Sequence, residues 1–393
     1  MNRRWWCAIV SGAVLSAGAC SSGGEEPPAA APAPPPPVAV VSPSPGVSDA
    51  KAACEERVVG RMSPQQRAGQ LLLIGTEVDA PGGLADEIRQ HHLGGVFLHG
   101  RSTRSAAALR ADIQALQGSA ATPLLVALDQ EGGSVQTLKG PDFPRIPSAE
   151  RLGAGPATEL RTANQDSARR LRGIGINLNL SPVADTVPAA IGEANPPIGY
   201  FHRQYGADPA QVSEDIAQVV AASQGEGVLT TLKHFPGLGR TRFNTDTSTK
   251  AVDATATLTD PYLKPFAAGI KAGSASVMVS SAFYPRLDKD SIAPFSKRII
   301  TGLLRDRMGF EGMVMSDDLG AAKAAAPLPP GDRAVRFIAA GGDLTLSIRP
   351  EDAAPMAAAL TEKAQADPGF YARITDAAER VVRAKIRAGV VAC

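Results

Sequence analysis

Residues 123–133 read PLLVALDQEGG, an apolar run that ends abruptly in an aspartate, a glutamate and two glycines. A continuous apolar run of this length predicts a strand buried on both faces, as in a parallel sheet. Seven further segments have the same character: QLLLIGTEV from Gln70, GGVFLHG from Gly94, INLNLSPVAD from Ile176, VLTTLKHF from Val228, SVMVSSAF from Ser276, GMVMSDDL from Gly312 and DLTLSI from Asp343. Ala-rich stretches of helical period separate these segments, and several of them end in glycine, as helices do.

This alternation predicts an α/β protein built as a single (β/α)8 TIM-type barrel. Apolar strands alternating with helices imply a parallel sheet covered on both faces. Eight such units without a run of antiparallel hairpins fit a closed barrel better than an open sheet. No G-x-G-x-x-G follows the first strand, which weakens a dinucleotide-binding alternative.

The composition describes a folded and electrostatically neutral protein. The 393 residues include 40 Lys plus Arg and 39 Asp plus Glu, and 44% are hydrophobic. That apolar fraction suffices for a large core and excludes disorder of the whole chain. The near-zero net charge gives no reason to expect nucleic acid as a partner. The 4 cysteines are too few for a disulfide scaffold and lack zinc-site spacing.

The N-terminal region precedes the barrel, which we expect to occupy residues 51–393. Two arginines, a short apolar run and small residues before Cys20 predict a signal peptide over residues 1–19. A cysteine there resembles the bacterial lipoprotein signal, in which the new N-terminal cysteine is lipidated; an ordinary secretory peptide is the alternative. Residues 20–50 are rich in Pro and Ala and predict a disordered linker. We therefore expect an exported, extracytoplasmic protein, lipid-anchored to the bacterial cell envelope through Cys20.

Two cysteines remain in the predicted domain, Cys54 near its start and Cys393 at the end of the chain. Thiols pair in an oxidising exterior. Because barrel folds bring their termini close together, we expect a disulfide between these two residues. Two free thiols are the alternative.

Polar side chains gather where the predicted strands end. The third strand runs into 129–133 (DQEGG), the fourth into Asp185, the fifth into 233–237 (KHFPG) and the seventh into 316–318 (SDD). Each of these segments, taken alone, could be purely structural, since an Asp after a strand is often a helix N-cap and a strand-end His is often a core residue. Catalytic residues of barrels lie at this end of the strands, so the convergence of all four predicts an active site.

The residue types indicate hydrolysis. Carboxylates beside a Lys-His pair, with no cofactor motif, suit a hydroxyl-rich substrate such as a sugar. Retaining glycosidases need one carboxylate as nucleophile and a second group as acid and then base. We expect neither a cofactor nor a metal.

Three motifs make the resemblance specific. DQEGGSVQ from Asp129, KHFPGLG from Lys233 and the GF-x-G-x-V-x-SDDL pattern from Gly309 resemble glycoside hydrolase family 3, in its β-N-acetylglucosaminidase (NagZ-like) branch. The resemblance extends from about residue 63 to the C-terminus with the motifs in the same order. It implies a (β/α)8 barrel, in agreement with the strand pattern.

The resemblance assigns roles to five residues. The family nucleophile falls on Asp317, and its neighbour Asp318 is structural. Asp129 matches the aspartate that hydrogen-bonds sugar hydroxyls at the closed end of the pocket. Lys233 and His234 match the pair that grips the same sugar.

Two positions depart from the family pattern. The arginine of the family motif IG-x-RSF-x-x-DP corresponds to Arg203 in IGYFHRQYGADP, displaced by two extra residues, and we expect it to bind substrate. Thr137 stands where the VQR form of the motif carries a substrate-contacting arginine. We expect that contact to be absent.

The loop after the fifth strand departs further. The family pattern KHFPGHG-D-T-x-x-DSH supplies its acid/base through an Asp-x-His dyad, whereas this chain reads KHFPGLGRTRFNTDT. Asn244 replaces the dyad aspartate and Asp246 replaces the dyad histidine. In one interpretation Asp246 is itself the acid/base, as in most retaining glycosidases, and Asn244 supports it by a hydrogen bond. In the other the loop has lost its acid, and the protein cleaves only good leaving groups or merely binds sugar.

The intact nucleophile favours the first interpretation. The resemblance then implies a retaining exo-β-N-acetylglucosaminidase, of the β-N-acetylhexosaminidase type, that hydrolyses terminal β-linked GlcNAc. An enzyme anchored outside a bacterial membrane meets peptidoglycan, so we expect muropeptides from cell-wall turnover as substrate. The alternative is a catalytically impaired surface lipoprotein that binds GlcNAc-containing glycans. A metal-dependent barrel hydrolase is a further alternative, although no His-x-His follows the first strand.

Overall fold

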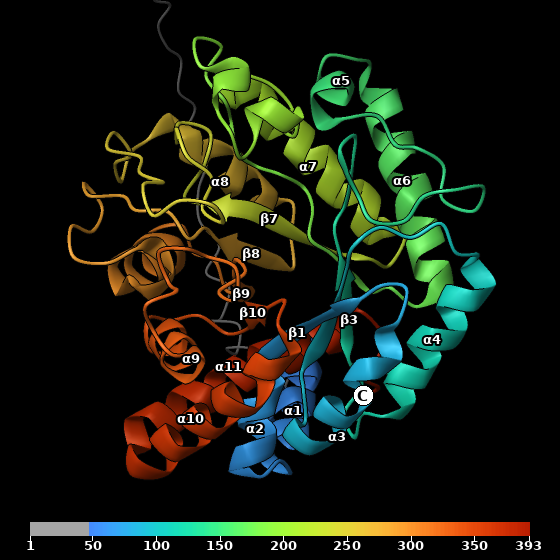
Figure 1. The fold of residues 1–393 in the computed structure, drawn as a ribbon, viewed down its shortest axis with the longest axis vertical. Helices are drawn as coiled ribbons and strands as arrows, with labels where there is room; N and C mark the ends of the chain where they lie inside the picture. The colour runs from blue at the N-terminus through green and yellow to red at the C-terminus, as the bar shows by residue number, and fades with distance from the viewer. Residues whose placement is uncertain (1–46) are drawn as a thin grey trace, which may run out of the picture. The chain divides into compact units, whose positions relative to one another are not determined.

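The computed structural model describes residues 47–393 (Figure 1). The predicted signal peptide, Cys20 and most of the predicted linker lie outside these residues. Eight parallel strands form one sheet in the order β10-β1-β2-β3-β6-β7-β8-β9. Their bounds are Leu72–Glu77 (β1), Gly95–His99 (β2), Leu125–Leu128 (β3), Leu178–Asn179 (β6), Leu229–Phe235 (β7), Ser276–Val279 (β8), Met313–Ser316 (β9) and Thr345–Ser347 (β10). Each strand lies within one of the eight predicted segments.

The sheet closes into a barrel between its last and first members. Met315 of β9 forms a parallel bridge with Leu344, which directly precedes β10. The backbone N–H of Ser316 donates to the Leu344 carbonyl at 3.1 Å. This closure confirms the predicted (β/α)8 architecture, and it places the C-terminal ends of all eight strands on one face.

Helices surround the barrel and cover the outer face of the sheet (Figure 1). The principal ones are Pro64–Gln70 (α2), Ala85–His91 (α3), Ala106–Gly118 (α4), Ala149–Gly153 (α5), Ala157–Ile174 (α6), Pro209–Gly225 (α7), Lys264–Lys271 (α8), Arg298–Arg307 (η6), Pro330–Ala339 (α9), Ala353–Ala366 (α10) and Pro368–Arg387 (α11). Local chemistry sets their ends: Ser105 caps α4 by accepting from the Ala108 N–H, and Gly175 ends α6 at φ 96°. Glycine adopts this left-handed conformation without a steric penalty.

A short antiparallel ribbon interrupts the regular alternation after β3. Gln130–Gly132 (β4) pairs with Val135–Gln136 (β5). The sequence pattern did not predict it, because two- and three-residue strands carry no periodicity. Gly132 and Gly133 make its turn, with φ of 103° and 55°. The ribbon begins immediately after Asp129.

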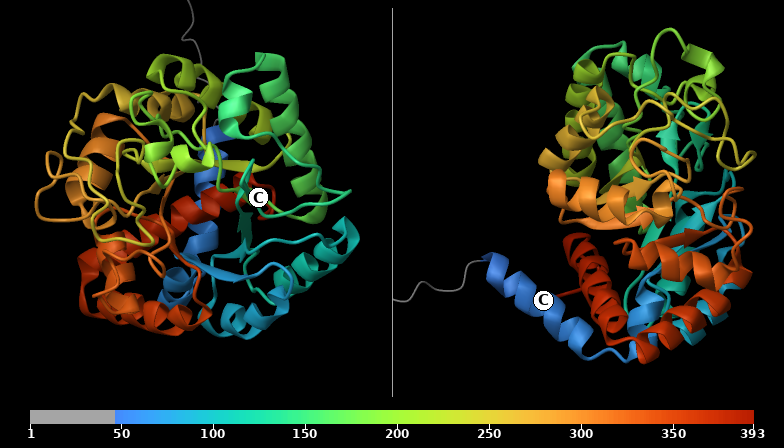
Figure 2. Two further views of the ribbon diagram at one scale, coloured as in Figure 1. Left: turned by 45° about the horizontal axis from the view of Figure 1, so that its top comes forward. Right: turned by 90° about the vertical axis from the view of Figure 1, so that its left-hand side faces the viewer.

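The two ends of the described chain lie side by side. The helix Val47–Gly60 (α1) packs beside α11 (Figure 2). The structure contains a disulfide between Cys54 and Cys393, whose sequence separation is 339 residues. Beside it, the guanidinium Nε of Arg383 donates to both carboxylate oxygens of Glu55, at 3.0 and 2.8 Å. The predicted boundary between residues 50 and 51 falls within α1.

No helix between residues 47 and 393 has the length and apolar character needed to cross a membrane.

Candidate active site

A cavity of about 220 Å³ opens at the C-terminal ends of the strands. Its walls come from several strand ends and from the loops after β6 and β7. Eight residues singled out from the sequence line it: Asp129, Arg203, Lys233, His234, Asn244, Asp246, Asp317 and Asp318. The barrel therefore brings together side chains that are up to 189 positions apart, from Asp129 to Asp318.

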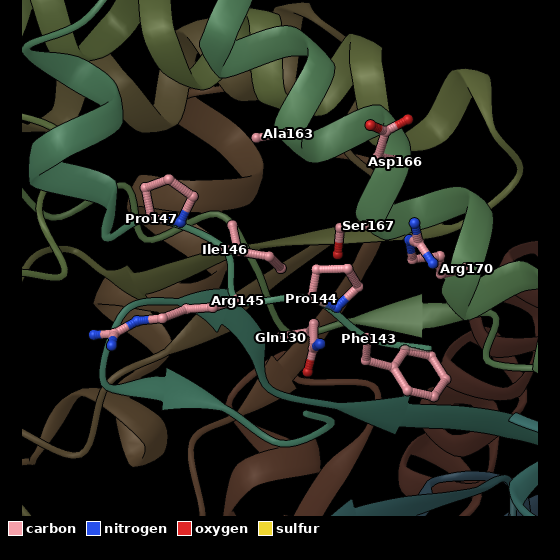
Figure 3. A pocket seen from close by; sticks show the side chains of 10 residues that line it. All are labelled: Gln130, Phe143, Pro144, Arg145, Ile146, Pro147, Ala163, Asp166, Ser167 and Arg170. Carbon is pink, nitrogen blue, oxygen red and sulfur yellow. The ribbon is translucent and has the colours of Figure 1, made fainter. Parts of the chain in front are cut away.

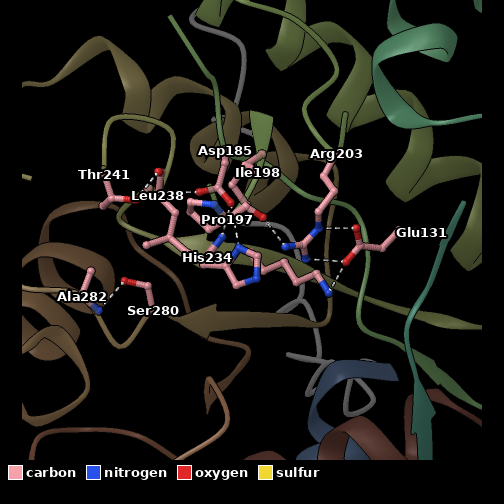
Figure 4. A network of polar contacts seen from close by, with 12 residues as sticks. Glu131, Asp185, Pro197, Ile198, Arg203, His234, Leu238, Thr241, Ser280 and Ala282 are labelled. Carbon is pink, nitrogen blue, oxygen red and sulfur yellow. Dashed lines mark hydrogen bonds and ion pairs between the residues drawn. The ribbon is translucent and has the colours of Figure 1, made fainter. Parts of the chain in front are cut away.

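One wall is a largely buried cluster of two cations, Lys233 and Arg203, and two carboxylates, Asp129 and Glu131; Figure 4 shows the Arg203–Glu131 pair. Lys233 Nζ lies 2.6 Å from Asp129 Oδ1 and 2.6 Å from Glu131 Oε1. Arg203 donates to both oxygens of Glu131, with Nε at 2.8 Å and Nη2 at 2.7 Å. It also donates from Nη1 to the Pro197 carbonyl at 2.8 Å, which fixes the plane of the guanidinium.

Charge compensation keeps Glu131 and Lys233 ionised. Burial alone would raise the pKa of Glu131, but the charges of Arg203 and Lys233 lower it to about 2. Burial would likewise lower the pKa of Lys233, yet Asp129 and Glu131 raise it above its ordinary value. The side chain of Asp129 stays 26% exposed, compared with 5% for Glu131. Asp129 is therefore the carboxylate of the cluster that remains available to a ligand.

Glu131 was not singled out from the sequence. Its partners lie 72 positions away at Arg203 and 102 positions away at Lys233, so spacing alone carried no signal. Its place beside Asp129 at a strand end was the one available indication. Thr137, where the family arginine is missing, is buried and donates from Oγ1 to the Asp129 carbonyl at 2.9 Å. Thr137 therefore supports Asp129 from behind and does not line the cavity.

A second buried pair orients His234. Its ring Nδ1 lies 2.7 Å from Asp185 Oδ2, and its backbone N–H donates to the same oxygen at 3.1 Å. The other oxygen of Asp185 accepts from the Leu238 N–H at 2.7 Å. Because a carboxylate only accepts hydrogen bonds, Nδ1 carries a proton. Asp185 thus fixes the rotamer of His234 and the path of the chain after β7.

Asp317 lies at the end of β9, where its backbone N–H donates to the Val279 carbonyl at 2.9 Å. Its Oδ1 accepts from the Asp318 N–H at 2.9 Å. Asp318 turns its own Oδ1 to three backbone N–H groups, of Gly320, Ala321 and Ile348. Asp318 therefore holds the backbone turn that presents Asp317, although burial raises its pKa to about 7.

Asp246 lies at the rim of the cavity, on the loop after β7. The loop is attached to the segment after β9, since the Lys323 N–H donates to the Thr245 carbonyl at 3.0 Å. Asp246 is exposed as a residue. The protein around its carboxyl still removes enough hydration, together with the charge of Asp317, to raise its pKa from 3.8 to about 6. A carboxylic acid with that pKa can donate a proton near neutral pH.

The expected role of Asn244 differs in detail. We expected Asn244 to hydrogen-bond the carboxyl of Asp246. Its Oδ1 instead accepts from the backbone N–H of Asp246 at 2.8 Å. An Asn side chain readily bonds the backbone two residues ahead, in an Asx turn, so this local geometry takes precedence. Asn244 shapes the loop and leaves the carboxyl of Asp246 to the cavity.

A second cavity, of about 150 Å³, lies between the loop after β5 and helix α6 (Figure 3). Phe143, Ile146 and three other apolar residues form much of its wall, with Arg145 and Arg170 beside them. It contains none of the residues predicted for the site. Within the described part of the chain, no three His, Cys, Asp or Glu side chains are grouped as metal ligands.

The chain resembles known proteins over the whole barrel. Residues 65–384 match the family described as the glycosyl hydrolase family 3 N terminal domain. A protein named Beta-hexosaminidase from Stenotrophomonas maltophilia (strain R551-3) is 34% identical over 295 residues, which are 72% of this chain and 84% of that protein. A protein of the same name from Xanthomonas oryzae pv. oryzae is 32% identical over the same shares.

Solved structures agree with these matches. A Beta-N-acetylhexosaminidase from Beutenbergia cavernae DSM 12333 has a TM-score of 0.81 and 45% identity, covering 82% of this chain and 98% of that one. A family 3 beta-N-acetylglucosaminidase from Paenibacillus sp. str. FPU-7 has a TM-score of 0.77 and 31% identity, covering 84% and 64%. The matched region contains every residue of the cavity wall. The chain belongs to glycosyl hydrolase family 3 and is a glycoside hydrolase.

Proposed function

We propose that the protein is a retaining exo-β-N-acetylglucosaminidase in which Asp317 is the nucleophile and Asp246 the acid/base. The names of its relatives, which are hexosaminidases, support the choice of sugar. The observation that carries the mechanism is the pair of carboxylates in one cavity. Asp246 has a pKa raised to about 6, partly by the charge of Asp317. Two carboxyl groups with separated roles are what retaining hydrolysis requires.

In the first step, an oxygen of Asp317 forms a bond to the anomeric carbon while the bond from that carbon to the leaving oxygen breaks. The proton of Asp246 passes to the leaving oxygen, which departs as a neutral alcohol. In the second step, Asp246, now a carboxylate, takes a proton from water. The resulting oxygen attacks the anomeric carbon and frees Asp317, so the sugar leaves with retained configuration.

The remaining residues position the sugar. Asp129 offers carboxylate oxygens to its hydroxyl groups, and Lys233, Arg203 and His234 supply donors around the same ring. Glu131 stabilises the two cations without facing the ligand, because both of its oxygens are already bonded. Such preorganised groups cost little reorganisation when charge develops in the transition state.

The natural substrate follows from the proposed location. A protein anchored at Cys20 outside a bacterial membrane would meet peptidoglycan fragments, so terminal GlcNAc on muropeptides is the proposed material. The predicted signal sequence and Pro-rich linker support this location.

Release of 4-nitrophenol from 4-nitrophenyl β-N-acetylglucosaminide tests the proposal, with protein lacking residues 1–20. The parent should turn over, and Asp317→Asn should lose several orders of magnitude in kcat, because no other group can form the covalent intermediate. Proton NMR of the first-formed sugar should show the β-anomer. Absence of turnover in the parent would favour the glycan-binding alternative, and unchanged turnover in Asp317→Asn would exclude Asp317 as nucleophile.

A further inference from the structure

Large hydrophobic side chains are exposed at few places on the described chain. Four stand out: Tyr200 at 61%, Phe201 at 38%, Phe243 at 44% and Leu258 at 50%. Three of the four are aromatic. Exposed aromatic groups that cluster usually mark a binding surface, because leaving them in water has no benefit for stability.

The three aromatic residues lie on the two loops that carry the rim of the active site. Tyr200 and Phe201 lie between Pro197 and Arg203, which both line the cavity. Their rings are in edge-to-face contact, with centroids 4.9 Å apart. Phe243 directly precedes the lining segment 244–246. Each aromatic residue is therefore within three positions of a residue that lines the cavity.

A buried asparagine ties these two loops together. Asn195 is fully buried, and its Nδ2 donates to the carbonyls of Leu238 and Thr241 at 2.8 Å each. Its Oδ1 accepts from the N–H groups of Ile198 and Gly199 at 3.0 and 2.9 Å. Figure 4 shows Pro197 and Ile198 beside Leu238 and Thr241. The two Nδ2 bonds hold the loop of Asn195 against the loop after β7, and the two bonds to Oδ1 fix the turn of its own loop.

The position of the proposed acid, Asp246, indicates which part of the substrate the three aromatic rings can contact. In the proposed mechanism Asp246 protonates the oxygen between the two sugars, so the leaving sugar lies outward from Asp246 while the GlcNAc occupies the cavity. Asp246 is itself at the rim. The leaving sugar therefore lies over the loops that bear the three aromatic residues.

We propose that Phe243 and the Tyr200–Phe201 pair form a binding site for the leaving-group sugar, by stacking against the apolar C–H face of a pyranose ring. This rests on the proposed exo-glycosidase function, because it takes the cavity to hold the terminal sugar. Tyr200 and Phe201 fall within the stretch that carries two extra residues before Arg203, and Phe243 within the altered loop after β7. The proposed site thus lies in the two stretches in which this chain departs from the family pattern, one by two extra residues and the other by substitution.

Binding measurements test this site independently of catalysis. In an Asp317→Asn background, which cannot form the covalent intermediate, calorimetric titration compares GlcNAc with N,N′-diacetylchitobiose. The disaccharide should bind more tightly than the monosaccharide. Phe243→Ala and Tyr200→Ala/Phe201→Ala should each weaken the disaccharide about 3- to 10-fold, as expected for one stacked ring, and leave GlcNAc binding unchanged.

Leu258→Ala is the matched control, since it removes a similarly exposed hydrophobic group that does not adjoin the cavity wall. It should leave the affinity for both sugars unchanged. Equal affinity of the Asp317→Asn protein for the two sugars, or equal weakening of both by the aromatic substitutions, would overturn the proposed site. Failure of the hydrolase proposal has a different signature: the unsubstituted protein would bind these sugars without releasing GlcNAc from the disaccharide.

Discussion

Above about pH 6, kcat/KM for N,N′-diacetylchitobiose (below, chitobiose) should fall tenfold for each further pH unit, because the proposed acid Asp246 must enter the reaction protonated. Its pKa is raised from 3.8 to about 6 by loss of hydration and by the charge of Asp317. At about pH 6 this pKa keeps roughly half of the carboxyl groups protonated, compared with roughly 0.6% for an unshifted carboxyl. The shift therefore raises the fraction of enzyme with a protonated Asp246 roughly 80-fold at that pH.

Initial rates on chitobiose between about pH 4 and pH 9, for the parent and Asp246→Asn, measure this effect. The variant should lose about 10²- to 10⁴-fold on chitobiose, the range typical of a general acid, and its rate should no longer fall above about pH 6. With 4-nitrophenyl β-N-acetylglucosaminide, the rate of the first step should decrease less in Asp246→Asn, because 4-nitrophenolate leaves without a proton. Added azide should then accelerate the variant by attacking the covalent intermediate, yielding the β-azide.

Asp318 provides the control, because burial raises its pKa to about 7, close to the same range. An asparagine oxygen can accept the three backbone N–H groups that Asp318 Oδ1 accepts. Asp318→Asn should therefore leave the fall in rate at about pH 6 in place. The reasoning would be refuted if Asp246→Asn kept the parent's rate and pH profile on chitobiose.

Three further properties can be measured by urea unfolding. The Glu131 pKa is lowered from 4.5 to about 2, so its charged form should contribute about 3 kcal/mol of stability above pH 4.5, lost as the pH falls towards 2. Glu131→Gln should unfold at lower urea and lack that pH dependence, and an unchanged midpoint would exclude the effect. The Cys54–Cys393 disulfide closes a long loop, so Cys393→Ser should lower the free energy of unfolding by about 2–5 kcal/mol; equal stability of the two proteins would contradict this. Lys385 is fully buried, and burial lowers its pKa from 10.5 to about 7. Because the folded state binds that proton less tightly, stability should rise as the pH increases from about 7 to 10.5. Lys385→Met should be more stable at neutral pH and show less of this rise; a less stable variant would contradict the argument.

The strand pattern predicted the fold because each buried strand of a parallel barrel is an uninterrupted apolar run. The same logic located Asp129 and Asp317, which directly follow strands β3 and β9. The β4–β5 ribbon escaped notice because its strands are too short to show a period. The position of Asn244 was predicted, but its hydrogen-bond partner was not, since a local Asx turn competes with the longer-range bond.

The roles of residues whose hydrogen-bond partners are far away in the sequence could not be predicted from motif spacing. Glu131 serves Arg203 and Lys233, and Asn195 joins two loops by contacts 43 and 46 positions away. Only the closed barrel brings these groups together, so their roles require coordinates. The same holds for Asp246, whose pKa is raised by loss of hydration and then by the charge of Asp317.

Covalent trapping of the nucleophile tests the central claim most directly. A 5-fluoro-N-acetylglucosaminyl fluoride has a good leaving group and a ring substituent that slows hydrolysis of the intermediate, so the glycosyl-enzyme should accumulate. Mass spectrometry of peptides from the treated protein should then show one added sugar, attached to Asp317, and none in Asp317→Asn. A sugar attached to another residue, or steady release of sugar by Asp317→Asn, would contradict the proposed mechanism.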